Sequence, residues 1–191
     1  KNTWCPGCGN FGVLTALKGA VSSLVRKGTR KEDIVVVSGI GCSSKIIDYL
    51  DLNTFSSLHG RPVVSAEGIK LGNPKLKVIV CAGDGGIYNE GIAHLIHAAK
   101  RNSDINVLVC NNRLFALTTG QFTATSPEDF KGKSTPTGSV ERPVNPLELV
   151  LSANGTFIAR SYALRVKHLE NMIVKALDHK GFSFIDVLQP C

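Results

Sequence analysis

The sequence has few aromatic residues, few charges and no long apolar run. Aromatic residues make up 6% of its 191 residues and charged residues 19%. No window approaches the roughly 18 consecutive apolar residues of a membrane-spanning helix, so we expect no contact with the membrane interior. Phe122, Phe130 and Phe157 are not interleaved with basic runs, as a stacking platform for single-stranded nucleic acid would require. Composition therefore disfavours both membrane insertion and nucleic-acid binding.

The sequence also lacks an initiator methionine and the apolar stretch of a signal peptide. It begins at Lys1 and ends on Cys191, so we expect both ends to be clipped relative to the natural chain. Six cysteines without a secretion signal favour a reducing compartment over a disulfide scaffold. We therefore predict a cytoplasmic protein with free thiols.

What the sequence does contain is enough apolar material for one substantial core. Hydrophobic residues make up 43% of the chain, and this length predicts a single domain over residues 1–191. The formal net charge is +7, which suits an anionic ligand or an acidic protein partner.

Strand and helix patterns alternate along the chain. Short β-branched runs are typical of strands buried on both faces of a parallel sheet, and apolar residues at helical spacing lie between them. The alternation predicts a doubly wound, mostly parallel α/β sheet with helices on both faces and a ligand site at the carboxyl ends of the strands. We expect strands at 34–38, 78–82, 105–110, 156–159 and 182–188, and helices at 13–25, 43–50, 92–100, 147–152 and 166–177.

One long segment, 111–145, has no clear periodicity and is rich in Thr, Ser, Gly and Pro. An irregular segment of this length inside a compact domain is functional or disordered. We expect it to form a loop over a bound cofactor.

The sequence Gly83-Asp84-Gly85 follows one buried strand, and Asn112 follows the next. If the connection is a right-handed crossover, both strand ends open on the same edge of the sheet. A carboxylate, an amide oxygen and a backbone carbonyl after Asn112 would then suit Mg²⁺, with glycines allowing a diphosphate to approach. An ordinary strand-to-helix turn could also contain Gly and Asp, but the paired Asn111-Asn112 favours the metal site.

Four of the six cysteines occupy positions in the sequence that suit ligands of a metal ion or an iron–sulfur cluster. Cys5 and Cys8 form a Cys-x-x-Cys turn, while Cys42 and Cys191 each follow a predicted strand. Four thiolates suit an iron–sulfur cluster or a zinc ion, and a redox dithiol at the first pair is a third possibility. The remaining two, Cys81 and Cys110, lie within apolar strands and are expected to be core residues.

The motifs together resemble one family. The chain is similar to the beta subunit of 2-oxoacid:ferredoxin oxidoreductases from Cys5 to Cys191, with a thiamine diphosphate-binding fold. The motifs that carry the resemblance, in order, are Cys5-Pro6-Gly7-Cys8-Gly9, Gly39-Ile40-Gly41-Cys42-Ser43-Ser44, His59-Gly60-Arg61, Ala66-Glu67-Gly68-Ile69-Lys70, Gly83-Asp84-Gly85, the run from His94 to Asn102, Asn111-Asn112 and Gly120-Gln121.

The resemblance implies three cofactors and their ligands. Magnesium would bind Asp84, Asn112 and the main-chain carbonyl of Leu114. A four-iron four-sulfur (4Fe-4S) cluster would bind the four placed cysteines: Cys5, Cys8, Cys42 and Cys191. Thiamine diphosphate would contact Ile40, Gly41, Cys42, Ser43, His59, Gly85, Gly86, Ala116 and Leu117.

Two further residues have competing interpretations. His59 precedes Gly-Arg in a loop, where a histidine is often a solvated turn residue, whereas the resemblance implies a cofactor contact. Lys45 follows Cys42 and is a candidate for attracting the substrate carboxylate, although a lysine on an exposed helix face is common.

The resemblance implies oxidative decarboxylation of a 2-oxoacid, pyruvate or 2-oxoglutarate first among them. The acyl group would pass to coenzyme A and the electrons to ferredoxin. The glutamate that activates the aminopyrimidine has no candidate here, so an alpha (or alpha/gamma) subunit would supply that half-site in a heterodimer. The alternatives are a non-oxidative thiamine diphosphate-dependent decarboxylase or synthase subunit, and a zinc-stabilised binding module.

The chain departs from the family pattern at three positions. Many members have an acidic residue where this chain has Gly86, and glycines where it has Ala116 and Thr119. These differences affect the segments expected to approach the diphosphate.

Overall fold

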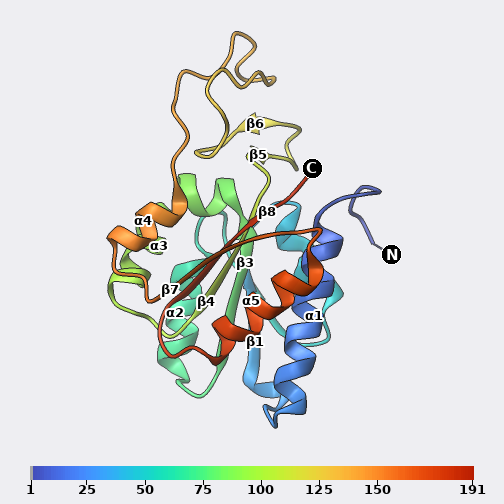
Figure 1. Ribbon diagram of the computed structural model, residues 1–191, viewed down its shortest axis with the longest axis vertical. Helices are drawn as coiled ribbons and strands as arrows, with labels where there is room; N and C mark the ends of the chain where they lie inside the picture. The colour runs from blue at the N-terminus through green and yellow to red at the C-terminus, as the bar shows by residue number, and fades with distance from the viewer. Residues whose placement is uncertain (1) are drawn as a thin grey trace.

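The computed structural model describes residues 2–191 and contains a six-stranded sheet in which every neighbouring pair is parallel (Figure 1). The strand order is β2-β1-β3-β4-β8-β7. The strands are β1 (Ile34–Ser38), β2 (Asn53–Ser56), β3 (Lys77–Gly83), β4 (Asn106–Asn111), β7 (Phe157–Tyr162) and β8 (Ser183–Leu188); β5 (Leu114–Phe115) and β6 (Gln121–Phe122) form a separate antiparallel hairpin.

Helices cover both faces of the sheet, so the predicted fold class is confirmed. Strand residues alternate between two cores: Val36 packs on one face and Val37 on the other. The first core packs against α1 (Asn10–Arg26), α5 (Val166–Asp178) and a 3₁₀ segment, η2 (Ser43–Tyr49). The second packs against α2 (Pro62–Gly72), α3 (Ile92–Lys100) and α4 (Pro146–Ser152). Cys81 and Cys110 are core residues, as predicted.

The strand order reverses between β1 and β3. From this pair, β2 lies to one side, while β4, β8 and β7 follow on the other. Loops that leave the carboxyl ends of β1 and β3 therefore turn to opposite faces, which opens a crevice between them. The motifs after these two strands both lie at this crevice.

Several sequence-based element predictions were wrong in detail. The segment 43–50 is a 3₁₀ helix, and the crossover after β3 is divided at Gly91 into a π-helical segment, η3 (Gly85–Glu90), and α3. The sequence did not predict β2, because all four of its residues are exposed at the sheet edge and it has no apolar run. It did not predict α2 either, which begins with Pro62 and contains two glycines.

The segment 111–145 contains no regular structure beyond β5 and β6 and an isolated bridge. It rises beyond the carboxyl edge of the sheet, where its yellow and orange trace occupies the top of Figure 1. Among residues 2–191, no helix combines the length and apolar character that crossing a membrane requires.

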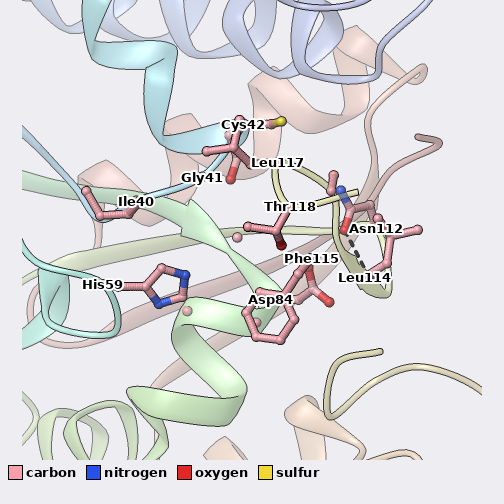
Figure 2. Close-up of a pocket in the computed structure, with 15 residues that line it drawn as sticks. Ile40, Gly41, Cys42, His59, Asp84, Asn112, Leu114, Phe115, Leu117 and Thr118 are labelled. Carbon is pink, nitrogen blue, oxygen red and sulfur yellow. Dashed lines mark hydrogen bonds between the residues drawn. The ribbon is translucent and has the colours of Figure 1, made fainter. Parts of the chain in front are cut away.

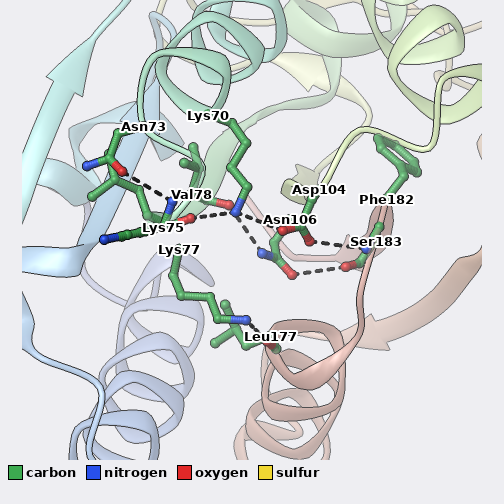
Figure 3. Close-up of polar contacts among 12 residues, drawn as sticks. Lys70, Asn73, Lys75, Lys77, Val78, Asp104, Asn106, Leu177, Phe182 and Ser183 are labelled. Carbon is green, nitrogen blue, oxygen red and sulfur yellow. Dashed lines mark hydrogen bonds and ion pairs between the residues drawn. The ribbon is translucent and has the colours of Figure 1, made fainter.

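A polar cluster joins the opposite, amino-terminal edge of the sheet (Figure 3). Lys70 Nζ donates to the carbonyl of Leu76 and pairs with Asp104 Oδ2, both at 2.7 Å. The other carboxylate oxygen of Asp104 accepts from the Gly181 amide at 3.1 Å. This contact ties α2 to the loops that precede β4 and β8, remote from the crevice.

Asp104→Asn should lower stability at neutral pH by about 1 kcal/mol, because the half-exposed pair is screened by water. Partial burial raises the pKa of Asp104, but the Lys70 ammonium and the Gly181 N–H outweigh it and hold the pKa below its ordinary value. The contribution is therefore present above the unfolded-state pKa of about 3.9 and lost as the pH falls. Urea unfolding of both proteins at pH 7 should show the difference. Below the lowered pKa the two curves should converge, and a constant difference would contradict this assignment.

Candidate cofactor site

The crevice contains a pocket lined by every residue predicted to contact the diphosphate cofactor or magnesium (Figure 2). The lining comes from the segments that follow β1, β3 and β4 and from the loop around His59. Its residues are Ile40, Gly41, Cys42, Ser43, His59, Gly83, Asp84, Gly85, Gly86, Asn112, Leu114, Phe115, Ala116, Leu117 and Thr118.

Glycines after β3 allow the chain to turn tightly below this pocket. A Cβ atom at Gly85 would lie 2.2 Å from the Phe115 ring, so no larger residue fits there without displacing the ring. A Cβ atom at Gly83 would approach Ser43 Oγ to 3.1 Å. The π-helical geometry that follows is uncommon and frequently found at functional sites.

The carboxyl group of Asp84 lies at the bottom of the pocket and is 1% exposed. Oδ2 accepts hydrogen bonds from Thr123 Oγ1 at 2.6 Å and Thr125 Oγ1 at 3.2 Å. Burial raises the pKa of Asp84 to about 6, although these hydroxyl bonds lower it. A buried carboxylate with no cationic partner in residues 2–191 is suited to a bound metal cation.

The two adjacent asparagines have different environments. Asn112 lines the pocket, and its Oδ1 accepts from the Leu114 amide at 3.2 Å (Figure 2). Asn111 is buried and faces a different set of partners, Asp186 and Thr125. Of the pair, only Asn112, the predicted magnesium ligand, lines the pocket.

His59 enters the pocket from the loop before α2. Its ring lies 5.9 Å from the Phe115 ring, and its Nδ1 faces the Glu90 carboxylate at the end of η3, a contact that becomes an ion pair when the imidazole is protonated. The nearest atom to a Cβ built on Gly86 is His59 Cε1, at 3.7 Å. His59 is thus held against the turn that carries Asp84, rather than turned into solvent.

The four cysteines placed as ligands lie in three segments that meet at one end of the sheet. Trp4 Nε1 donates to the Cys42 carbonyl at 2.7 Å, and the Gly9 amide donates to the Pro190 carbonyl at 3.3 Å. Burial raises the pKa of Cys42. The charge of Lys45 lowers this pKa, and the neighbouring thiols of Cys8 and Cys5 raise it. Burial also raises the pKa of Cys191, with further increases from the other three thiols. The structure therefore brings all four thiols within electrostatic range.

In residues 2–191, no three His, Cys, Asp or Glu side chains already form a group that could hold a single metal ion. Four thiolates from these segments suit a 4Fe-4S cluster, in which each thiolate binds a different iron, or a zinc ion.

Buried carboxamides near the thiols also lack partners. Both side-chain amide atoms of Asn10, two positions after Cys8, are buried without a hydrogen bond, as is Oε1 of Gln189 near Cys191. Unpaired buried polar groups of this kind cost about 1–3 kcal/mol each. Their position beside the cysteine segments suits a polar or ionic group bound there.

Lys45 does not line the cofactor pocket but the cavity beside it, which shares Ile40, Gly41 and Leu117 with that pocket. Ser38 and Ser44 also line this second cavity, and their buried hydroxyls have no partner. Asp48 lines the cavity as well, so it offers a polar ligand one cation, one carboxylate and two unpaired hydroxyls.

The departures from the family pattern have different structural consequences. A Cβ at Gly86 meets no atom closer than 3.7 Å, so the loss of an acidic residue leaves space rather than strain. Thr119 has a φ of 75°, a conformation that favours glycine, the residue that the resemblance implies at this position. Ala116 lines the pocket without any such backbone strain.

Sequence reasoning missed four residues of the site. Phe115 and Thr118 line the pocket, and Thr123 and Thr125 bind the Asp84 carboxylate. All four lie in the segment 111–145, whose lack of periodicity gives no indication of which side chains turn toward Asp84.

Comparisons with known proteins agree with this geometry. Residues 39–187 match the family described as "Thiamine pyrophosphate enzyme, C-terminal TPP binding domain". The chain is 47% identical to 2-oxoacid:ferredoxin oxidoreductase subunit beta of Saccharolobus solfataricus, over 100% of this chain and 62% of that protein. It is 42% identical to 2-oxoglutarate synthase subunit KorB of Archaeoglobus fulgidus, over 98% of this chain and 69% of that protein.

Solved structures give the same result. The structure titled 2-oxoglutarate:ferredoxin oxidoreductase from Magnetococcus marinus, with 2-oxoglutarate, coenzyme A and succinyl-CoA bound, matches with a TM-score of 0.96 and 34% identity, over 100% of this chain and 65% of that one. The 4-hydroxybenzoylformate decarboxylase of Rhodococcus jostii RHA1 shares the fold, with a TM-score of 0.61 and 20% identity over 92% of this chain and 32% of that one. The chain spans about three fifths of the length of the first curated relatives. It belongs to the family of 2-oxoacid:ferredoxin oxidoreductase beta subunits and contains their thiamine pyrophosphate-binding domain.

Proposed function

We propose that this chain binds the diphosphate end of thiamine diphosphate through Mg²⁺. Asp84, Asn112 and the Leu114 carbonyl would hold the metal, since they supply the oxygen ligands that Mg²⁺ prefers. The observation that carries this assignment is the pocket at the β1/β3 switch point, with a buried carboxylate at its base. The glycines at 85 and 86, and the segment Ile40 to Ser43, offer backbone close to the phosphates. His59, Ala116 and Leu117 line other parts of the same pocket.

We infer that Cys5, Cys8, Cys42 and Cys191 hold a 4Fe-4S cluster. The four thiols lie in segments that meet at one end of the sheet, beside the unpaired Asn10 and Gln189, whose position suits a bound ionic group. Cys42 lines the cofactor pocket and is also one of the four thiols. A route for electrons between the two cofactors would therefore pass through a short stretch of this chain.

The proposed reaction is oxidative decarboxylation of a 2-oxoacid, with coenzyme A as acyl acceptor and ferredoxin as electron acceptor. Bound thiamine diphosphate supplies a nucleophilic carbon and an electron sink. The chain's residues fix its diphosphate, and the apolar Ile40 and Leu117 border the neighbouring cavity where the substrate would lie. Substrate class and acceptor are proposed from the names of the relatives, one of which is bound to 2-oxoglutarate and coenzyme A.

A partner subunit would complete the enzyme. The pocket offers no glutamate for the aminopyrimidine, so we propose an alpha subunit, or an alpha/gamma pair, that supplies that half of the site in a cytoplasmic heterodimer. The net charge of +7 suits an acidic electron acceptor such as a ferredoxin.

Lys45 is proposed to attract the substrate carboxylate. Lys45→Met should raise the KM for the 2-oxoacid roughly 10- to 100-fold, since a hydrogen bond to a charged group is worth about 1.5–3 kcal/mol. Thiamine diphosphate affinity should be unchanged, because the lysine lies outside the cofactor pocket. Steady-state kinetics of the complex with Lys18→Met, an exposed lysine, as the matched control would measure this. Equal KM values for both variants would remove Lys45 from substrate binding.

The proposed function is tested by co-purification with the partner under anaerobic conditions, followed by viologen reduction assays across 2-oxoacids with coenzyme A. Dye reduction that needs both the 2-oxoacid and this chain supports the proposal. Decarboxylation without dye reduction would favour a non-oxidative decarboxylase, and colourless protein containing zinc would favour a zinc-stabilised binding module.

A further inference from the structure

The hydroxyl groups that bind Asp84 contact only one of its carboxylate oxygens. Thr123 and Thr125 both donate to Oδ2, and no side chain in residues 2–191 donates to Oδ1. Both threonines are buried, with exposed fractions of 2% and 6%. The side-chain contacts thus hold the carboxylate through Oδ2, and the backbone N–H groups of Asp84 and Asn112 further favour its charged form.

Thr123 is the principal donor to Asp84. Its hydroxyl lies 2.6 Å from Oδ2, compared with 3.2 Å for the hydroxyl of Thr125. The single proton of Thr125 is shared, because its oxygen is also 2.9 Å from Asn111 Oδ1. Thr125 therefore links Thr123 and Asp84 to Asn111 rather than acting as a full second donor.

Asn111 is fixed in one orientation. Its Nδ2 donates to Asp186 Oδ1 at 3.0 Å, and its Oδ1 accepts from the Arg113 amide at 3.3 Å. A flipped amide would place oxygen against carboxylate and nitrogen against an N–H group, so both contacts oppose it. Asp186 is fully buried and is held in turn by Tyr88 Oη and Arg160 Nε, each at 2.8 Å.

The same contacts dock the long segment 111–145 onto the sheet. Thr123 N donates to Ser126 Oγ at 2.8 Å, and Ala124 N donates to Asn89 Oδ1 at 2.9 Å. Thr123, Thr125 and Ser126 are buried, whereas residues 127–129 are exposed. One turn of this segment is therefore built into the floor of the pocket.

We propose that Thr123, supported by Thr125 and Asn111, is a positioning residue that holds Asp84 Oδ2 and thereby sets the affinity of this chain for its divalent cation. The proposal rests on the proposed function, in which Asp84 is a magnesium ligand. Groups that orient a metal ligand typically affect metal affinity 10- to 100-fold when removed. Thr123 does not itself line the cofactor pocket and acts on it through the Asp84 carboxylate, so its effect should fall on metal binding.

The test is the Mg²⁺ concentration that gives half-maximal thiamine diphosphate binding, measured on the co-purified complex by calorimetry. Thr123→Val removes the hydroxyl at nearly constant volume and should raise this concentration 10- to 100-fold. Thr123→Ser retains the hydroxyl and should restore it to near the original value. Thr15→Val, which removes an exposed threonine hydroxyl on α1, is the matched control and should have no effect.

Three outcomes would overturn the proposal. An unchanged Mg²⁺ requirement in folded Thr123→Val would do so while leaving the proposed function intact. An equal loss in Thr123→Ser and Thr123→Val would assign the effect to packing rather than to the hydroxyl. If the original complex binds thiamine diphosphate without any dependence on a divalent cation, both this inference and the magnesium assignment are wrong.

Discussion

Asp84→Asn should abolish Mg²⁺-dependent binding of thiamine diphosphate and at the same time make the cofactor-free protein more stable. The loss of affinity should exceed 100-fold, because the variant removes the only charged oxygen ligand of the proposed metal site. The gain in stability follows from burial. An ionised carboxylate in this environment is costly unless a cation accompanies it.

The sign of the stability change follows from the pKa. Burial raises the pKa of Asp84 to about 6 in the folded protein, above the unfolded value of about 3.9. Stability is therefore full below the unfolded value and falls as the pH rises through 6, by about 3 kcal/mol in total. Asparagine cannot ionise, so the variant should keep that stability at pH 7.

Thermal unfolding of both proteins, with and without Mg²⁺ and thiamine diphosphate, measures the two effects together. The variant should unfold at a higher temperature without ligands, and ligands should shift only the original protein. Asp129→Asn, which changes an exposed aspartate, should reproduce neither effect. A variant that is less stable without ligands and still binds the cofactor would make Asp84 a structural turn residue.

Cys8→Ser should remove the proposed cluster and all electron transfer while leaving thiamine diphosphate binding in place. A hydroxyl is a poor substitute for thiolate on iron, and Cys8 raises the pKa of both Cys42 and Cys191, so it lies near the other thiols. Iron and acid-labile sulfide should fall from about four per chain to a small remainder, with loss of visible absorption.

Cys81→Ala is the matched control for this variant. Cys81 is fully buried in a strand and is one of the two cysteines assigned to the core. Its replacement should leave iron content and colour unchanged. Zinc in the original protein, in place of iron and sulfide, would contradict the cluster assignment for all four cysteines.

Much of the fold could be predicted because its central strands are buried on both faces. Short, mostly apolar runs rich in β-branched or aromatic residues identified β1, β3, β4 and β8, which are almost entirely buried. The two strands at the edges of the sheet lack this apolar pattern, because β2 has no buried residue and β7 has only one. The spacing of apolar residues also could not predict the type of helix, because the 3₁₀ and π-helical segments depend on the tight turns around the pocket.

The candidate site was likewise predicted only in part. Asp84 and Asn112 were predicted to converge because parallel strands connected by a right-handed crossover end on one edge, and both line the pocket. Thr123 could not be predicted, because an irregular segment brings it back to Asp84 from 39 positions away in sequence. The separation of Asn111 from Asn112 likewise depends on partners in β8 and the long segment, which sequence spacing does not specify.

If electrons released at the thiamine site pass to a cluster on this chain, the cluster must become reduced when substrate is added. The anaerobic complex can be frozen shortly after mixing with a 2-oxoacid and its electron paramagnetic resonance spectrum recorded. We expect a reduced-cluster signal that requires the 2-oxoacid and is absent from Cys8→Ser. Release of carbon dioxide with no cluster signal in the original protein would contradict it.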